Sequence, residues 1–383
     1  MKHLILTSAI VAAFAAPVGA ETLTIGTATA QTGGLAYADV PTMQGMKLAI
    51  DEINAAGGID GATKIALLEK DVRSDPAQTS IAAQELADAG VSVIVLPGDS
   101  DPALAAIGVV SSAKIPAIST VASSPTLPQI GGDYMFSNFP GDNVQAAVSA
   151  KWAWDEGYKT AWIVYSPDTQ YTTMPLYFRD VFEKLGGEML GESTNTIGQQ
   201  DFSAIATTIA AQDPHPDLVM TSAYEPDFPS MLIALRAAGV TSQVIGSDGI
   251  DSPTTFSLGD VGEDVVFTTA GFAIKGSPLE AFDKAFEQKY GSAPESIYSA
   301  VGYDLIKVIE AAVIVAGSTD PTKIRDAMAD LENVQGATGL ITYKGTNGMP
   351  VRQVSLIRVK DGGRELVGQP SPDANLIPAP RMQ

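Results

Sequence analysis

Strand-like and helix-like stretches alternate along the chain from residue 21 onward, and this alternation restricts the possible fold more than any other feature. The strand-like stretches are short, apolar and rich in β-branched residues, as in VSVIVL at 91–96. The stretches between them carry apolar residues at helical spacing, as in 41–58. A strand that is apolar on both faces is typical of a parallel sheet covered by helices. The alternation therefore predicts an α/β protein.

The alternating series occurs twice, which predicts two α/β units in a chain of 383 residues. For the first unit we expect strands and helices at 22–28, 41–58, 64–70, 76–90, 91–96, 103–113 and 115–120. For the second we expect them at 160–166, 172–187, 187–193, 201–212, 217–223, 227–239, 243–248 and 265–271. Three more helices and two strands with a turn between them follow, at 277–291, 295–317, 320–331, 339–345 and 350–363.

The N-terminal segment MKHLILTSAIVAAFAAPVGA, residues 1–20, has the pattern of a cleaved secretory signal. One lysine precedes a short apolar stretch, and small residues precede Glu21. No later segment has the unbroken apolar length that a membrane span needs. The chain has no cysteine, which excludes a disulfide framework, thiol catalysis and lipid attachment at an N-terminal cysteine. We therefore expect a freely diffusing periplasmic protein.

The formal net charge of −21 argues against nucleic acid and anionic membranes as partners, because both require a basic surface. Zinc ligands are essentially lacking, with two histidines and no cysteine. The loop GSDGIDSPT has too few acidic positions at the right spacing for calcium. We therefore expect no metal and no cofactor, and a small-molecule ligand as the partner.

Ser100 follows the apolar strand at 91–96 and precedes a helix start marked by Pro102. This strand, turn and helix arrangement suits both a nucleophile and a group that only holds a ligand. A Ser-His-Asp enzyme would have to use His215, because His3 leaves with the signal. His215 lies between two prolines, in the segment that precedes a strand. The loops that precede strands are usually at the opposite end of the sheet from the functional loops. We therefore favour binding over an exported serine hydrolase.

Polar residues stand at four strand ends, two in each unit, where ligands of open α/β sheets bind. They are Ser100, Ser123, Tyr224 and Asp248. Each also has a plainer interpretation: Ser100 as a helix cap, and Asp248 as a brace for its turn. If the four meet, the ligand lies between the two units, and the crossings between the units form a hinge that closes on it.

The sequence resembles the type I periplasmic binding proteins that serve branched-chain amino acid ABC transporters. The resemblance covers nearly the whole mature chain and rests on QTGGLAYAD, GMKLAIDEINAAGGIDG, SDPAQ, RAAGV and IGSDG. It implies two Rossmann-like α/β lobes joined by a multi-stranded hinge, with an N-terminal lobe of 21–140 plus 272–349 and a C-terminal lobe of 141–271 plus 350–383. It further implies a membrane permease as partner and a monomer in solution.

The resemblance also implies roles for individual residues. Ser100 and Ser123 match hydroxyl residues that hold the α-carboxylate and ammonium of a bound amino acid. Tyr224 matches a tyrosine that closes on the ligand, and Asp248 falls where the family has a glutamate that pairs with the ammonium. Aromatic residues of the cleft wall and side-chain pocket match Tyr171, Tyr37 and Tyr298, each of which also suits ordinary packing.

Two departures from the family pattern leave the identity of the ligand undecided. Asp248 is one methylene shorter than the family's glutamate, and Asp99 and Asp101 flank Ser100 with negative charge. The family's disulfide cannot form, because its positions are Ser74 and Asp99 here. Related proteins bind amides, urea or aromatic acids, and a sensor subunit has the same fold. A branched-chain or other amino acid remains the expected ligand.

Overall fold

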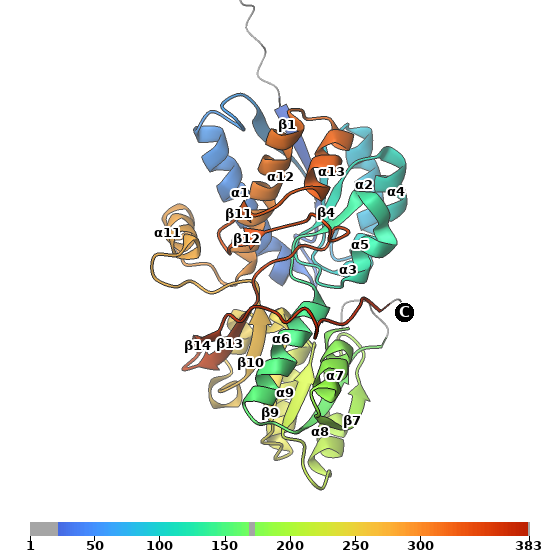
Figure 1. The fold of residues 1–383 in the computed structure, drawn as a ribbon, viewed down its shortest axis with the longest axis vertical. Helices are drawn as coiled ribbons and strands as arrows, with labels where there is room; N and C mark the ends of the chain where they lie inside the picture. The colour runs from blue at the N-terminus through green and yellow to red at the C-terminus, as the bar shows by residue number, and fades with distance from the viewer. Residues whose placement is uncertain (1–21, 168–172, 382–383) are drawn as a thin grey trace, which may run out of the picture.

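Figure 1 shows the computed structural model as two lobes stacked along the longest axis, and the structure describes residues 22–167 and 173–381. One lobe is built on a five-stranded sheet and the other on a seven-stranded sheet. The predicted two-lobed α/β fold is confirmed. The predicted signal, residues 1–20, lies outside the described residues. Among the described helices, none has both the length and the apolar character that crossing a membrane requires.

The five-stranded sheet is parallel throughout, in the order β2-β1-β3-β4-β5. Its strands are β1 (Thr22–Thr29), β2 (Lys64–Asp71), β3 (Val93–Leu96), β4 (Ala117–Ser119) and β5 (Met135–Ser137). One face is covered by α2 (Pro76–Asp88), α3 (Ser100–Leu104), α4 (Ile107–Ala113) and α5 (Thr126–Gly131). The other is covered by α1 (Ala36–Ala55), α12 (Tyr298–Ala316) and α13 (Pro321–Ala329).

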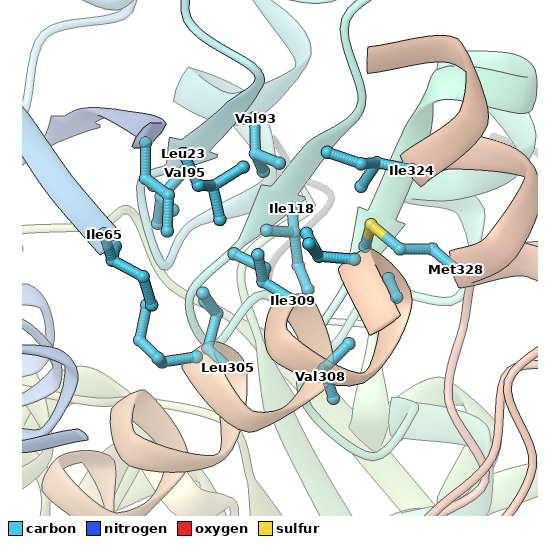
Figure 2. Close-up of a cluster of buried hydrophobic side chains, with 14 of the residues drawn as sticks. Leu23, Ile65, Val93, Val95, Ile118, Leu305, Val308, Ile309, Ile324 and Met328 are labelled. Atoms are coloured by element: carbon cyan, nitrogen blue, oxygen red, sulfur yellow. The ribbon is translucent and has the colours of Figure 1, made fainter. Parts of the chain in front are cut away.

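Both faces of strand β3 are buried, which explains why its sequence is apolar without a break. Val93 and Val95 point into the core under α12 and α13, which Figure 2 shows. Ile94 and Leu96 belong to the core on the opposite face. Since successive side chains of a strand point to opposite faces, both sets are buried, as the sequence predicted.

The seven-stranded sheet has the order β14-β13-β10-β9-β8-β6-β7. Its parallel strands are β6 (Thr160–Tyr165), β7 (Glu188–Thr194), β8 (Leu218–Thr221), β9 (Gln243–Gly246) and β10 (Val266–Thr269). At one end of the sheet, β13 (Ser355–Lys360) runs antiparallel to β10, and the edge strand β14 (Gly363–Gly368) runs antiparallel to β13. One face is covered by α6 (Asp142–Asp155) and α7 (Met174–Lys184), the other by α8 (Ser203–Ala210) and α9 (Asp227–Ala237).

The chain passes between the two lobes three times: between β5 and α6, between β10 and α11 (Pro278–Tyr290), and between β12 (Leu340–Ile341) and β13. Short elements complete the fold: η1 (Gly132–Tyr134), η3 (Asp248–Ile250), α10 (Pro253–Phe256), η4 (Gly259–Val261) and β11 (Val334–Gln335). The lobe boundaries given above, at residues 140, 271 and 349, stay a prediction.

Several elements differ from the expected ones. Helix α6 and the short elements α5 and β5 were not expected, and α1 begins at Ala36 rather than at residue 41. The stretch 103–113 was expected as one helix, but it forms the end of α3 and a separate α4. The strands expected at 339–345 and 350–363 belong to different sheets: β12 pairs with β11, while β13 pairs with β10 and β14. A single antiparallel bridge between Thr342 and Val351 joins the two segments. Strand pairing of this kind depends on neighbours distant in sequence, which local patterns do not contain.

Helices α1 and α12 approach each other closely enough to require glycine at the contact. A Cβ atom on Gly45 would lie 1.7 Å from the carbonyl oxygen of Ser299, and one on Gly302 would lie 2.0 Å from that of Thr42. Helix axes come this near only where side chains are absent. The contact fixes the two helix starts, which carry Tyr37 and Tyr298, relative to one another.

A buried ion pair joins two of the crossings to α12. Arg352, in the third crossing, lies 2.6 Å from the Asp304 carboxylate of α12, and both side chains are almost wholly buried. Arg352 also donates to Asn138, in the first crossing, whose side-chain amide donates to the Val301 carbonyl at 2.9 Å. The pair is therefore part of the hinge itself.

The C-terminal tail packs along α6 and α7. The Asn143 side chain of α6 donates to the Pro378 carbonyl at 2.8 Å. The Arg381 backbone N–H donates to the Tyr177 hydroxyl at 2.8 Å, and the Arg381 guanidinium pairs with Asp180. Across the described residues the tail thus belongs to the seven-stranded lobe.

Candidate functional site

Asp39 organises the carboxyl ends of the first sheet. This fully buried carboxylate of α1 accepts hydrogen bonds from the Ala30 N–H at 2.7 Å, the Gly98 N–H at 2.9 Å and the Thr120 hydroxyl at 2.8 Å. The three donors follow β1, β3 and β4. Burial raises the pKa of Asp39 to about 6, and the three hydrogen bonds oppose that shift. Asp39 thereby holds together the loops on which Ser100 and Ser123 stand.

Ser100 is the first residue of α3, and the side chain of Asp99 caps this helix by accepting the Asp101 N–H at 3.1 Å. Asp99 therefore takes the capping role that the sequence offered to Ser100. The Ser100 hydroxyl is fully buried and has no hydrogen-bond partner in the described structure. A buried hydroxyl without a partner costs free energy, so it is a group suited to meet a ligand.

Three of the predicted tyrosines lie together. The ring of Tyr37 stacks on that of Tyr224, with centroids 6.1 Å apart and planes 20° apart. The edge of Tyr37 also meets Tyr298 at a centroid distance of 6.1 Å. Tyr37 and Tyr298 begin helices of the first lobe, whereas Tyr224 follows β8 of the second. The aromatic contact therefore crosses between the lobes.

Asp248 lies at the start of η3, directly beyond β9, and is 3% exposed. The Tyr298 hydroxyl donates to its carbonyl oxygen at 2.9 Å and to its Oδ2 at 3.2 Å. Burial raises the pKa of Asp248 to about 8, and the negative charge of Asp142 adds to the shift. A cation beside Asp248 would stabilise its ionised form and so lower this pKa.

Asp142 is a site residue that sequence reasoning missed. It is buried in the first turn of α6, where it accepts hydrogen bonds from the hydroxyls of Ser123 and of Thr173, the latter at 2.9 Å. Burial raises its pKa to about 6. The only available signal was an acidic residue in the helix start GDN, a common feature of exposed helices. Its electrostatic effect on Asp248 depends on the packing of α6 against the seven-stranded sheet, which contains β9.

Asp99 is a further buried carboxylate in the loop that carries Ser100. This carboxylate is 6% exposed, and burial raises its pKa to about 7, with the charges of Asp101 and Asp39 adding to the shift. The charges of Asp99 and Asp101 in turn raise the pKa of the Tyr224 hydroxyl, after the larger effect of burial. The charge of Asp99 therefore acts on the hydroxyl group of Tyr224, one of the stacked tyrosines.

Direct contacts join four of the seven predicted site residues, and both lobes contribute to them: the rings of Tyr224, Tyr37 and Tyr298 meet in turn, and Tyr298 donates to Asp248. Ser123 donates to Asp142, whose charge raises the pKa of Asp248. Ser100 follows Asp99 in the chain, and the charge of Asp99 raises the pKa of Tyr224. Tyr171, the seventh, lies outside the described residues.

His215 does not join this group. It is exposed and precedes β8, at the end of that strand opposite Tyr224. Ser100 stands in the other lobe, beyond β3. The geometry therefore gives Ser100 no histidine base, as expected from the sequence.

The buried ionisable groups of the site are acidic, and no basic group balances them in the described residues. Among the described residues, five buried aspartates have no ion-pair partner: Asp39, Asp99, Asp142, Asp227 and Asp248. The one buried cation in the described part of the chain, Arg352, already pairs with Asp304. Hydroxyls and aromatic rings complete the site. The arrangement suits a small ligand that carries a positive charge and accepts hydrogen bonds from neutral donors.

Known proteins are similar to this chain over most of its length. A family model described as "Periplasmic binding protein" matches residues 22–364. The chain is 27% identical over 361 residues to the Leu/Ile/Val-binding protein BraC3 of Rhizobium johnstonii, covering 93% of this chain and 97% of that protein.

Two solved structures have similar folds. The leucine binding protein LivK of Thermotoga maritima has a TM-score of 0.82 at 25% identity, covering 91% of this chain and 98% of that one. An ABC transporter solute binding protein of R. palustris, in complex with 4-hydroxybenzoate, has a TM-score of 0.82 at 20% identity, covering 92% and 98%. At that identity the second similarity concerns the fold alone.

Proposed function

The chain belongs to the periplasmic binding protein family, and on this premise we propose that it captures an amino acid between its lobes and delivers it to an ABC transporter permease. The family is one of binding proteins, so the protein is not an enzyme. Family membership also implies a periplasmic location. We propose that residues 1–20 are removed on export.

One observation carries the choice of ligand: Asp248 is buried at a strand end and has no ion-pair partner among the described residues. A buried carboxylate without a cation is unfavourable, as its raised pKa of about 8 reflects. An α-ammonium group on the ligand would supply that cation. A hydrogen bond between charged groups contributes about 1.5–3 kcal/mol, enough to favour an amino acid over an uncharged ligand.

The α-carboxylate of the same ligand requires donors without a positive charge, because the site offers no buried free cation in its described part. The Ser100 hydroxyl is such a donor, buried and without a partner. The Ser123 hydroxyl serves the Asp142 carboxylate. We assign Ser100 to the ligand carboxylate, and Ser123 to the support of Asp142 beside the ammonium.

An aromatic acid fits the site less well. Such a ligand would bring a negative charge among Asp99, Asp142 and Asp248 and would offer no cation in return. The tyrosine cluster alone would suit a benzene ring, but the unfavourable electrostatic interaction would remain. An amino acid ligand also agrees with the name of the Rhizobium relative, a Leu/Ile/Val-binding protein.

The test is a thermal-shift screen of the mature protein after its ligand has been removed by unfolding and refolding. A ligand that binds the native state stabilises it, by about 2.7 kcal/mol at a concentration of 100 times Kd. We expect one or more α-amino acids to raise the melting temperature. Stabilisation by benzoates, amides or urea alone would contradict the proposal, and Asp248 would then need another role.

A further inference from the structure

The start of α12 receives a hydrogen bond acceptor from the other lobe. The residue before the helix is Ile297, whose apolar side chain cannot cap it. A glutamate at the third helical position often accepts the N–H of the cap residue, but Ala300 stands there. The Ser296 hydroxyl accepts the Tyr298 N–H at 3.3 Å and leaves the Ile297 N–H. The carboxylate of Asp251, in the second lobe, accepts that N–H at 3.0 Å.

Arg364 makes a second contact between the lobes. Its Nε donates to Oδ1 of Asp251 at 2.5 Å, and its Nη2 donates to the Glu295 carbonyl at 2.7 Å. Asp251 follows η3 and Arg364 lies in β14, both in the second lobe, whereas Glu295 and Ile297 lie between α11 and α12 of the first. Figure 1 shows β14 and α12 in different lobes. Each member of the ion pair thus binds a backbone group of the opposite lobe.

The second lobe holds both side chains in position for these contacts. The Asp251 side chain is 1% exposed, and its ion pair with Arg364 lies within the second lobe. The Arg364 guanidinium also lies over the Phe256 ring, 4.3 Å from its centroid. Since the side chains are already ordered, little conformational entropy is lost when they meet the first lobe. Hydrogen bonds to charged groups are also stronger than those between neutral groups.

The surroundings of the ion pair allow the lobes to separate here. A pocket of about 240 Å³ adjoins it, lined by Asp251 and Arg364 from the second lobe and by Asp283 and Ser296 from the first, among others. Protein cores leave few voids larger than a water molecule, so the two lobes are not packed into one core at this place. The hydrogen bonds between the lobes can therefore break without disrupting either core.

We propose that Asp251 and Arg364 form an interlobe latch, which holds the two lobes together without help from the ligand. The latch acts on the segments that carry the site: Asp251 lies three residues after Asp248, and Ile297 precedes Tyr298, whose hydroxyl donates to Asp248. The latch itself goes beyond the proposed function. Its effect on affinity rests on that function, because the apparent Kd rises when the closed fraction of the protein falls.

Small-angle X-ray scattering of the mature protein, freed of ligand by unfolding and refolding, measures the separation of the lobes. Asp251→Ala removes the acceptor of the Ile297 N–H and the partner of Arg364. We expect a larger radius of gyration than in the unaltered protein. The control is Asp180→Ala, which breaks an ion pair with Arg381 within the second lobe and should leave the radius unchanged. Equal radii for Asp251→Ala and the unaltered protein would overturn the inference.

Amide hydrogen exchange on the unaltered protein decides the question if Asp251→Ala does not fold. The Ile297 N–H precedes the first helical residue, and the hydrogen bond described for it is the one to Asp251. We expect this amide to exchange slowly in the ligand-free protein, measured by nuclear magnetic resonance. Exchange at the rate of an unstructured peptide would show that the latch does not hold the lobes together.

Affinity separates the latch from the proposed function. The probe is L-leucine, or the α-amino acid that stabilises the protein most in the thermal-shift screen. We expect Asp251→Ala to raise its Kd about tenfold, because a charged hydrogen bond between the lobes is lost. An unchanged Kd would overturn the inference and leave the proposed function in place. If no α-amino acid binds, the proposed function fails, and the scattering experiment still decides on the latch.

Discussion

The Tyr298 hydroxyl donates to both the main-chain oxygen and the Oδ2 of Asp248, at 2.9 and 3.2 Å. Tyr298 is the first residue of α12 in one lobe, and Asp248 is the first residue of η3 in the other. The hydrogen bonds therefore connect the two lobes through the residue proposed to bind the ligand ammonium. Opening of the lobes would break these hydrogen bonds and alter the surroundings of the Asp248 carboxyl group.

Replacing Asp248 by asparagine should weaken binding of an α-amino acid by about 1.5–3 kcal/mol, because a charged hydrogen bond to the ammonium is lost. This corresponds to about a ten- to 150-fold higher Kd, measured by calorimetry. The folded protein should not lose stability, because the amide oxygen of asparagine can still accept the Tyr298 hydrogen bond and the change breaks no ion pair of the described structure. Asp320→Asn, at the cap of α13, is the control. Unchanged affinity in Asp248→Asn would refute the assignment.

Ligand binding should release protons at pH 7. The pKa of Asp248 is raised to about 8, so its carboxyl group is largely protonated at pH 7 before the ligand binds. An ammonium beside it favours the ionised form and lowers the pKa. Binding enthalpies measured in two buffers of different ionisation enthalpy should therefore differ, and affinity should rise between pH 6 and pH 8. Equal enthalpies in both buffers would contradict the prediction.

The stability of the ligand-stripped protein should fall as the pH rises from about 4 to 8. Burial raises the pKa of Asp39 and Asp142 to about 6, of Asp99 to about 7 and of Asp248 to about 8, whereas unfolded aspartate titrates near 4. In this window the native state binds more protons than the unfolded state, so the free energy of unfolding decreases with pH.

Urea denaturation at pH 5 and pH 8 measures this dependence directly. We expect a higher free energy of unfolding at pH 5. Asp248→Asn should reduce the difference between the two values, because it removes the group with the highest of these four pKa values. A stability that rises between pH 5 and pH 8 would show that these four carboxyl groups do not dominate the titration.

Gly45→Ala should destabilise the protein by about 1–3 kcal/mol or more, because overpacking forces neighbouring groups apart. The added Cβ would lie 1.7 Å from the Ser299 carbonyl oxygen, which is part of the α12 backbone. The control is Gly108→Ala, since a Cβ there meets no atom within 4 Å. Thermal denaturation should show a large loss for the first variant and none for the second.

Arg352→Met should cost about 3–5 kcal/mol of stability, because it leaves the Asp304 charge buried without its partner. The double variant with Asp304→Asn should recover part of the loss. Asparagine can still accept a hydrogen bond from the Ala337 or Thr338 N–H. A double variant that is no more stable than Arg352→Met would show that the unpaired charge is not the cause.

Local patterns were sufficient for most of the fold. The run at 91–96 predicted a strand buried on both faces, and β3 contributes to the cores on both faces of its sheet. The spacing of apolar residues and the residues that begin and end helices are short-range properties. The sequence of a single chain therefore contains them in full. The break between α3 and α4 and the pairing of β12 with β11 were not predicted, because both depend on packing partners distant in sequence.

The sequence by itself also determined which residues stand at strand ends, because a strand and its following turn are adjacent in the chain. Ser100, Ser123, Tyr224 and Asp248 could be chosen on that ground. Only the tertiary structure decided which of them meet. Stacking of Tyr37 on Tyr224 requires the two lobes to be in position, and the effect of the Asp142 charge on Asp248 requires α6 to pack on the seven-stranded sheet. Burial, which raises the aspartate pKa values, is likewise a property of the assembled lobes and not of any segment.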